Sequence, residues 1–304
     1  MKKKIFVSLR ENHEVMDKVI QKLQESSEFD IILHRPFKDI VNLEEIIKTL
    51  REVDYIILKA SNKISLDILY FAKLYNIPTL HDFDTVITCR SKITLDSRLR
   101  QIIAKHKKEL ANFILPIPPS WVGLIDQRNL ENFKEWAASR LPLVIKSHDQ
   151  HDKFIRFSYL VRSLEEIDDF CQRFDGKLNY AVYVQKAIDC DNMDRKLYVV
   201  GDQVFGIRRE SPIEICLREN LNYINADEIE KHNLEIDERT QRVAKILSKE
   251  LNLKLFGFDL IKLVDRDRYY LIDVNDFPGY RGIPNIDKII VNYLEGFLKT
   301  KLKL

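Results

Sequence analysis

The chain has 304 residues, with 49 Lys and Arg against 47 Asp and Glu and a formal net charge of +2. Its 45% hydrophobic and 10% aromatic content excludes a largely disordered chain, and its length suits about two domains. Because the charge is nearly balanced, we expect neither nucleic acid nor an anionic membrane as a partner.

The four cysteines lie far apart and form no CxxC pair, which argues against a zinc site or a disulfide framework. The apolar run after Met1 is too short for a signal peptide, and no stretch approaches the ~20 apolar residues of a membrane span. We therefore expect a cytoplasmic protein. The chain has only 8 glycines, and neither of the Gly-rich nucleotide loops GxGxxG and GxxxxGK[ST] occurs.

The first eighty-odd residues alternate between short apolar runs and amphipathic segments, which is typical of a small parallel sheet covered on both faces. The predicted strands are Ile5–Leu9, Phe29–Leu33, Tyr55–Lys59 and Ile77–Leu80. The predicted helices are Glu14–Gln24, Leu43–Arg51 and Ser65–Tyr75. Ligands of such sheets gather at the carboxyl ends of the strands, where Arg10 and Lys59 lie. These two cations are candidates for binding an anionic substrate, although cations at strand ends are common.

The middle of the chain begins with a polar, basic segment that predicts a helix over Ser91–Leu110. A proline-rich extended stretch follows at Leu115–Ser120. The pattern then predicts helices over Phe133–Ser139 and Leu164–Phe174, and strands over Leu143–Ser147, Phe157–Val161 and Ala181–Lys186.

The last third is rich in strands. We expect strands at Lys196–Val200, Gln203–Arg208, Gly257–Val264 and Tyr269–Asn275, and a long helix near Asp237–Leu251. The Lys/Leu tail from Leu298 onward is interpreted as the solvated end of a last helix. No internal repeat or low-complexity linker separates the parts, so we expect the lobes to pack against one another.

The segment from Phe256 to Asn275 carries the most informative pattern. Two apolar strands are joined by a charged turn, as in a β-hairpin, and an acid interrupts each strand. Asp273 and Asn275 are two residues apart and therefore point the same way. Asp259 faces them if the connection has an odd offset or contains a bulge. Two carboxylates and an amide oxygen suit Mg²⁺. The alternative is a pair of solvent-facing charges on an edge strand, which the apolar neighbours disfavour.

This segment resembles the metal-binding end of ATP-grasp enzymes. The run Asn275-Asp276-Phe277-Pro278-Gly279-Tyr280 is especially similar to the inositol trisphosphate 5/6-kinases. The resemblance covers about residues 88–285. It implies an α/β ATP-grasp fold, with an N-terminal Rossmann-like domain and two α+β lobes that clasp ATP. It also implies that Asp259, Asp273 and Asn275 hold the magnesium, for which we expect two ions.

The resemblance extends to residues that would bind the nucleotide. Lys146 stands where the family has a lysine on the ATP phosphates, and Arg90 belongs to a segment similar to the Asp-Arg-x-Lys element that opens the central domain. Lys196 matches the family lysine near phosphate or substrate, which makes it a candidate catalytic residue as well. The implied adenine-binding hinge is Gln185, Lys186, Ala187 and Ile188. Without the family pattern, Lys146 would be an ordinary surface cation, and Gln185 could pair on an exposed strand face.

The residues implied for the phosphorylated substrate are fewer. His151 stands where the inositol kinases carry a histidine near the transferred phosphate, and Arg208 and Arg209 stand where they place an arginine. His151 and Arg209 are therefore candidate catalytic residues, and Gly279 is implied near the substrate. A histidine in a polar loop is often merely solvated. Neighbours on a strand point oppositely, so we expect only one of the two arginines to serve the site.

The chain also departs from the family. Cys89 replaces the family acid before Arg90, and residues 147–153 contain no glycine, so this loop is less able to fold over phosphates. Asp276 and Arg281 differ from the small and acidic residues of the family. These departures bear on the substrate more than on the nucleotide.

Three functions remain open at this point. The first is an ATP- and Mg²⁺-dependent phosphotransferase that acts on a hydroxyl of an inositol phosphate, because phosphoryl transfer needs metals and cations held around a triphosphate. The second is a carboxylate–amine ligase that works through an acyl phosphate. The third is a nucleotide-binding regulatory protein without turnover.

The expected organisation has three parts. Residues 1–85 form an α/β domain with acceptor contacts, residues 86–186 form the central ATP-grasp lobe, and residues 187–304 form the C-terminal lobe with the metal site. We expect a monomer whose partner is a small phosphorylated molecule.

Overall fold

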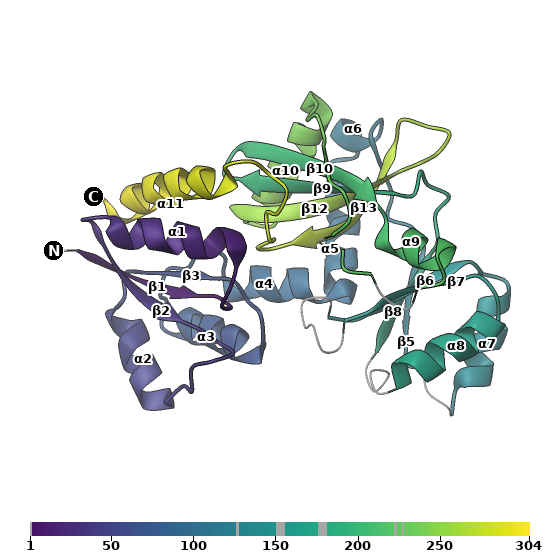
Figure 1. Ribbon diagram of the computed structural model, residues 1–304, viewed down its shortest axis with the longest axis horizontal. Helices are drawn as coiled ribbons and strands as arrows, with labels where there is room; N and C mark the ends of the chain where they lie inside the picture. The colour runs from purple at the N-terminus through teal and green to yellow at the C-terminus, as the bar shows by residue number, and fades with distance from the viewer. Residues whose placement is uncertain (1, 126–127, 150–155, 176–180, 222–223, 227) are drawn as a thin grey trace.

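The computed structural model describes residues 2–125, 128–149, 156–175, 181–221, 224–226 and 228–304. Its strands form three sheets, which occupy the left, upper and lower right parts of Figure 1. Within the described ranges no helix is long and apolar enough to cross a bilayer.

The N-terminal sheet is parallel, as the alternating pattern predicts, and has the order β2-β1-β3. Its strands are β1 (Lys3–Ser8), β2 (Phe29–His34) and β3 (Tyr55–Leu58). The helices that cover it are α1 (Glu14–Glu25), α2 (Leu43–Glu52) and α3 (Lys63–Leu74). All six lie within a few residues of their predicted positions.

The prediction of a fourth strand at Ile77–Leu80 is wrong. This segment makes only an isolated bridge, in which Thr79 is the partner of Ile56. Pro78 lacks an N–H group and cannot donate to a ladder, and the Asp82 carboxylate then accepts from the Thr85 N–H at 2.7 Å. That cap starts α4 (Phe83–Arg90), a helix that the sequence pattern missed.

The single helix expected at Ser91–Leu110 is in fact two. Ser91 has an extended backbone, and its hydroxyl accepts from the Thr94 N–H, so it ends α4 and begins α5 (Lys92–Lys105). A short helix, α6 (Lys107–Leu110), follows His106. The break within the basic segment therefore falls at His106, and the cap at Ser91 places Lys92 in the first turn of α5.

The central sheet is antiparallel and has the order β5-β8-β6-β7. Its strands are β5 (Ser120–Gly123), β6 (Leu143–Ser147), β7 (Ser158–Val161) and β8 (Val182–Lys186). Leu143 and Val184 face a core built with α7 (Leu130–Ala138) and α8 (Glu165–Phe174). Because side chains alternate along a strand, Lys146 and Gln185 project from the opposite face of the sheet.

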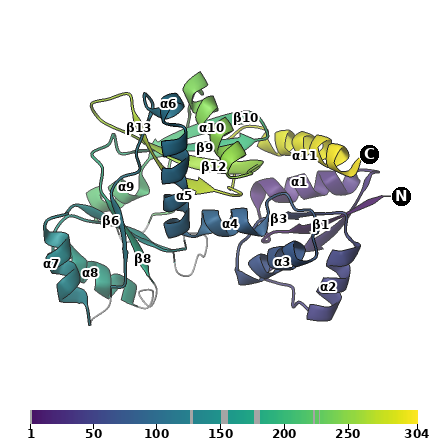
Figure 2. The same ribbon diagram turned by 180° about the vertical axis from the view of Figure 1, so that it is seen from behind.

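The C-terminal sheet has the order β11-β10-β9-β12-β13-β4. Its strands are β4 (Ile114–Leu115), β9 (Met193–Val200), β10 (Gln203–Glu210), β11 (His232–Asn233), β12 (Leu255–Lys262) and β13 (Tyr269–Asn275). In Figure 2, the view from behind, α5 and α10 (Glu238–Glu250) lie in front of this sheet, and their apolar sides share its core. A short helix that the sequence pattern did not predict, α9 (Pro212–Arg218), follows β10.

The last helix, α11 (Ile286–Leu302), joins the two ends of the chain by packing beside α1 (Figure 1). One core contains Ile5 of the first strand and Leu294 of this helix. The solvated tail expected from Leu298 onward is wrong in part, because Leu298 is fully buried in the same core. The helix ends at Leu302, and Lys303 and Leu304 beyond it are exposed.

Leu294→Ala tests whether this shared core stabilises the fold. Removing a fully buried leucine side chain should lower the free energy of unfolding by about 2–5 kcal/mol. Leu304→Ala, at an exposed position beyond the same helix, should change it by less than about 0.5 kcal/mol. Urea denaturation of both variants measures the difference, and equal effects would contradict the shared core.

Candidate active site

The two acids singled out in the sequence lie directly opposite each other. In the antiparallel pair of β12 and β13, Asp259 is the partner of Asp273, and the register shifts between Asp259 and Leu260. This bulge provides the offset that Asp259 needs in order to face Asp273 across the hairpin. Asn275 follows on the same strand, and its side-chain oxygen accepts from the Phe277 N–H at 3.0 Å.

Each acid is paired with a lysine. Lys196 is the register partner of Asp259 on β9, and its Nζ lies 2.7 Å from the Asp259 Oδ2. The Nζ of Lys92 contacts the Asp273 Oδ1 from the first turn of α5. Lys92 had no assigned role in the sequence. The only signal for it was its place in the Arg90-Ser91-Lys92 run.

The electrostatics of the two acids suit a divalent cation. Burial raises the pKa of Asp259, Lys196 opposes this shift, and the nearby Asp273 carboxylate adds to it. Burial lowers the pKa of Lys196, but the carboxylates of Asp259 and Asp194 outweigh burial and the net pKa is raised. A metal ion placed between the acids would relieve their repulsion.

The described residues contain no cluster of three or more His, Cys, Asp and Glu side chains that could hold a metal. The candidate is instead a pair of carboxylates with one amide, all oxygen donors. This donor set fits Mg²⁺, which keeps several waters and shares ligands with phosphates rather than demanding a complete protein cage.

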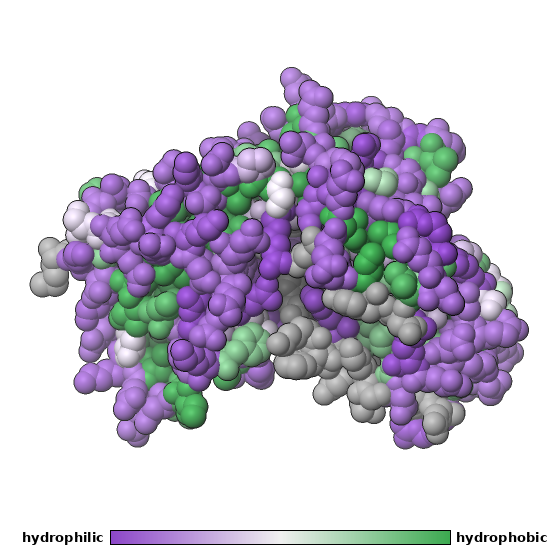
Figure 3. Space-filling view, in the orientation of Figure 1, coloured by the Kyte–Doolittle hydropathy of each residue, from purple (hydrophilic) through white to green (hydrophobic). Residues whose placement is uncertain are grey.

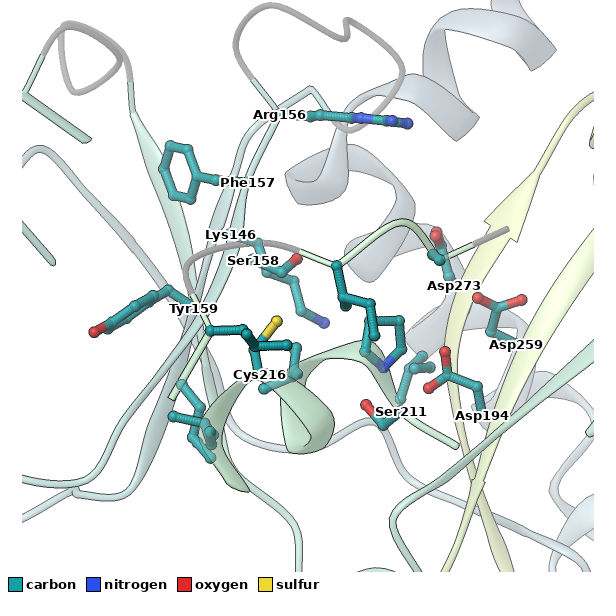
Figure 4. A pocket seen from close by; sticks show the side chains of 18 of the residues that line it. Lys146, Arg156, Phe157, Ser158, Tyr159, Asp194, Ser211, Cys216, Asp259 and Asp273 are labelled. Atoms are coloured by element: carbon teal, nitrogen blue, oxygen red, sulfur yellow. The ribbon is translucent and has the colours of Figure 1, made fainter. Parts of the chain in front are cut away.

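Both acids line a cavity of about 840 Å³ between the central and C-terminal sheets. Figure 4 shows Asp194, Asp259 and Asp273 close together on one side, with Lys146 pointing toward them from the other. The charged side chains that line it are Lys92, Lys146, Arg156, Arg173, Asp194, Lys196, Arg209, Asp259 and Asp273.

Many of the apolar side chains that line the cavity come from β7 and α9. In Figure 3 a group of apolar side chains is visible where Figure 1 places α9. The acids and the lysines therefore gather at one end of the cavity, and the apolar side chains lie at the other, together with Arg173 over the Tyr159 ring.

Lys146 projects from the central sheet, and its Nζ donates to the Gln185 Oε1 at 3.1 Å. Burial and, to a lesser extent, the positive charge of Lys92 lower the pKa of Lys146, whereas Asp273 and Asp259 raise it, and the net pKa is about 8. A lysine whose ordinary pKa is about 10.4 thus titrates near neutral pH.

The predicted hinge is largely occupied by contacts within the protein. Gln185 is buried, and its Nε2 donates to the Tyr183 hydroxyl at 2.9 Å. The N–H groups of Lys186 and Ala187 donate to backbone carbonyls, and the Lys186 ammonium donates to two more. Any recognition of a base by these residues therefore falls to their carbonyls and to Ile188, which is partly buried.

The two neighbouring arginines of β10 separate as strand alternation requires. Arg209 is buried and lines the cavity, and it donates to the Asp194 carboxylate at 3.4 Å and to the Ala226 carbonyl at 2.5 Å. Arg208 is exposed and lies opposite His232 on the edge strand. Asp194, two residues before Lys196, was not recognised in the sequence.

Arg90 links the N-terminal domain to the loop end of β6 in the central lobe. It is buried, its Nη2 lies 2.7 Å from the Asp149 Oδ2, and its Nη1 donates to the Ala60 carbonyl. Cys89 beside it is fully buried, and burial raises the pKa of its thiol well above the ordinary range. The thiol stands where the family has an acid, so this position adds no negative charge to the site.

A second group of cations lies where the N-terminal domain meets β13. Burial lowers the pKa of Lys59 to about 8, and its Nζ lies 5.3 Å from the centre of the Phe277 ring. Burial also lowers the pKa of Arg10, and the charges of Arg281 and Arg156 lower it further. Among the described residues, no atom lies within 4 Å of the place that a Cβ would take at Gly279. His151 lies outside the described residues.

Comparison with known proteins identifies the family of the chain. The family model of the inositol 1,3,4-trisphosphate 5/6-kinase ATP-grasp domain matches residues 114–296, more than half of the chain. The chain belongs to this family. The resemblance seen in the sequence is thereby confirmed.

Relatives within the family are distant in sequence. Inositol-tetrakisphosphate 1-kinase 1 of Oryza sativa is 27% identical over 53% of this chain and 48% of its own length. Inositol-tetrakisphosphate 1-kinase 3 of Arabidopsis thaliana is 24% identical over 75% of this chain and 67% of its own length. The chain matches about a third to a half of the length of the rice relatives.

Solved structures confirm the ATP-grasp fold. A D-alanine–D-alanine ligase from Bacillus anthracis superimposes with a TM-score of 0.66 at 16% identity, over 99% of this chain and 98% of its own. A RimK domain ATP-grasp protein from Sphaerobacter thermophilus has a TM-score of 0.67 at 12% identity, over 95% and 98% of the two chains. At these identities the likeness shows the fold alone.

The lowered pKa of Lys146 gives a prediction for pH. The Lys146 amine is protonated below about pH 8 and neutral above it. The affinity of the protein for an anionic nucleotide should therefore fall as the pH rises through 8. The fall should approach about tenfold per pH unit. Calorimetric titration with ADP between pH 6.5 and 9.5 measures it.

Lys146→Arg is the matched variant, because a guanidinium stays charged throughout this range. Its ADP affinity should change little between pH 7 and 9. A decline as steep as in the wild type would assign the pH dependence to another group.

Proposed function

We propose that this protein is an ATP- and Mg²⁺-dependent kinase that transfers the γ-phosphate of ATP to a hydroxyl of an inositol phosphate. The observation that carries the proposal is the pair of facing carboxylates, Asp259 and Asp273, at the lysine-rich end of a cavity large enough for a nucleotide. Membership in the inositol phosphate kinase family supports the choice of reaction.

The proposed work of the site is electrostatic. Asp259, Asp273 and Asn275 would hold two magnesium ions, which would neutralise negative charge on the phosphates when bound. Lys146 and Lys196, from opposite walls of the cavity, would bind further phosphate oxygens and fix the triphosphate in place. Little covalent chemistry is asked of the protein, since the reaction depends on alignment and on matched charge.

The nucleotide base would occupy the less charged part of the cavity. The apolar side chains from β7 and α9 offer a surface for an aromatic ring. Among the described residues, the predicted hinge Gln185–Ile188 does not line this cavity, and Gln185 meets it only through the Lys146 ammonium. Arg90 is bound to Asp149 after β6 and to the Ala60 carbonyl of the N-terminal domain, and it would fix Asp149 relative to that domain. Nucleotide binding by Arg90 stays a prediction.

The acceptor is proposed to lie between the first and last parts of the chain. Arg10, Lys59 and Arg209 would bind its phosphate groups, with Arg209 able to offer a planar pair of donors. A side chain at Gly279 would meet open space, and this glycine is proposed to lie near the acceptor. His151 remains a predicted contact of the transferred phosphate. Arg281 and Asp276 depart from the family pattern. We therefore expect the acceptor to be an inositol phosphate that differs from the acceptors of other family members.

The division into residues 1–85, 86–186 and 187–304 stays a prediction. The three sheets support three units. However, α5 and β4, both within 86–186, pack with the C-terminal sheet. This packing favours a central lobe that begins near residue 116. A monomeric state and a cytoplasmic location also stay predictions.

Asp273→Asn tests the metal assignment. It should lower kcat by at least about 100-fold, because the phosphates lose charge stabilisation in the transition state. Asp265→Asn, in the exposed turn of the same hairpin, should leave kcat unchanged. The measurement is ADP release with a panel of inositol phosphates, together with detection of the phosphorylated product.

The same assay separates the kinase from the carboxylate–amine ligase that the fold also allows. A kinase makes a stable phosphoester without an added amine, whereas a ligase releases phosphate only when an amine is present. If no inositol phosphate is phosphorylated and phosphate release depends on an amine, the kinase proposal is wrong.

Comparing Arg209→Gln with Arg208→Gln tests the acceptor site. The loss of Arg209 should raise KM for the phosphorylated acceptor by about 10–100-fold, as expected for a lost charge-assisted hydrogen bond. Arg208 points away from the cavity, so its loss should change KM less than about twofold. The nucleotide affinity serves as the internal control, and equal KM values for the two variants would contradict the assignment.

A further inference from the structure

Both proposed metal carboxylates are held by ammonium groups of this chain. Lys196 contacts Asp259 from the neighbouring strand, and Lys92 contacts Asp273 from the start of α5. The two acids are register partners, so lysine and carboxylate alternate around one small area of the cavity. The protein therefore supplies its own positive charge where a divalent cation would bind.

Lys92 is the more constrained of the two lysines. It is only 6% exposed, and it lines the cavity. Its backbone N–H donates to the His148 carbonyl at 3.1 Å, and Ser91 caps the helix at this point. The side chain consequently reaches Asp273 from a fixed backbone, close to the loop that follows Lys146.

The lysine and a metal ion compete for the same oxygen. The Lys92 ammonium contacts Oδ1 of Asp273, and Mg²⁺ binds carboxylate oxygens at about 2.0–2.1 Å. A buried ammonium and a divalent cation on one oxygen repel each other strongly. If the metal takes this oxygen, the ammonium needs another anion, and the phosphates of the nucleotide are anions that would enter the same cavity.

We propose that Lys92 is a third phosphate-binding lysine that serves as the counter-ion of Asp273 while the site holds no nucleotide. When metal and nucleotide bind together, its ammonium passes from the carboxylate to a phosphate oxygen. Metal alone must compete with the lysine, whereas metal with nucleotide need not. The two ligands therefore increase each other's affinity, and by linkage the increase is reciprocal.

Lys146 provides a matched comparison within the same cavity. It carries the same charge and interacts electrostatically with both Asp259 and Asp273. Its ammonium, however, donates to Gln185 rather than to either acid. Removing Lys146 removes a nearby positive charge without freeing a carboxylate. Any excess effect of removing Lys92 is then due to the direct contact.

The experiment measures Mn²⁺ binding to the full-length protein by electron paramagnetic resonance, with and without a non-hydrolysable ATP analogue. Without nucleotide, Lys92→Met should bind Mn²⁺ about tenfold tighter than the wild type, which corresponds to one lost competing ion pair. Lys146→Met should bind it less than about threefold tighter. The factor by which the analogue improves Mn²⁺ affinity should be smaller in Lys92→Met than in the wild type and Lys146→Met.

Several outcomes would overturn the inference. One is a Lys92→Met protein, folded by circular dichroism, whose Mn²⁺ affinity is unchanged, weaker, or raised no more than in Lys146→Met. If Lys92→Met does not fold, the wild type still tests the exchange. Equal Mn²⁺ affinity of the wild type with and without the analogue would exclude it.

This inference rests on the proposed nucleotide and metal site but not on the acceptor. The binding measurement needs neither an inositol phosphate nor turnover, so its result is independent of the kinase assay. Failure to phosphorylate any acceptor would remove the proposed reaction and leave the lysine exchange standing. A wild type that binds no Mn²⁺ even with the analogue would remove both.

Discussion

The alignment of three charged side chains across strands β9, β12 and β13 is the constraint on which the site depends. Lys196, Asp259 and Asp273 are successive register partners, so a shift of one residue in either strand pair would turn at least one of them into the apolar core behind the sheet. The bulge after Asp259 is what brings the two acids level. Burying such charges is costly, and each acid accordingly has a lysine partner.

The sequence was sufficient to predict the elements that carry this alignment. An acid inside each of two apolar strands, followed by Asn275, defined the metal candidate, and most strands and helices lie within a few residues of their predicted positions. These features depend on local periodicity and on residue types two positions apart. The resemblance to the family added the ATP-grasp fold, which the comparisons confirm.

Features that depend on distant pairing could not be read in the same way. Lys92 and Asp273 are 181 positions apart, and nothing local marks the lysine as a partner of the acid. Asp194 gains meaning only because Arg209 lies opposite it on the next strand. The missing fourth strand and the unpredicted helix α4 depended on Pro78 and on the single cap at Asp82, which weigh little in a periodic pattern. Strand alternation did distinguish in advance between the roles of Arg208 and Arg209, but not which of them faces the cavity.

A crystal structure with Mg²⁺ and a non-hydrolysable ATP analogue tests the central claim most directly. The account predicts magnesium within about 2.1 Å of oxygens from Asp259, Asp273 and Asn275, with the triphosphate against Lys146 and Lys196. Magnesium bound elsewhere, or a nucleotide whose phosphates lie away from the β12–β13 hairpin, would contradict it.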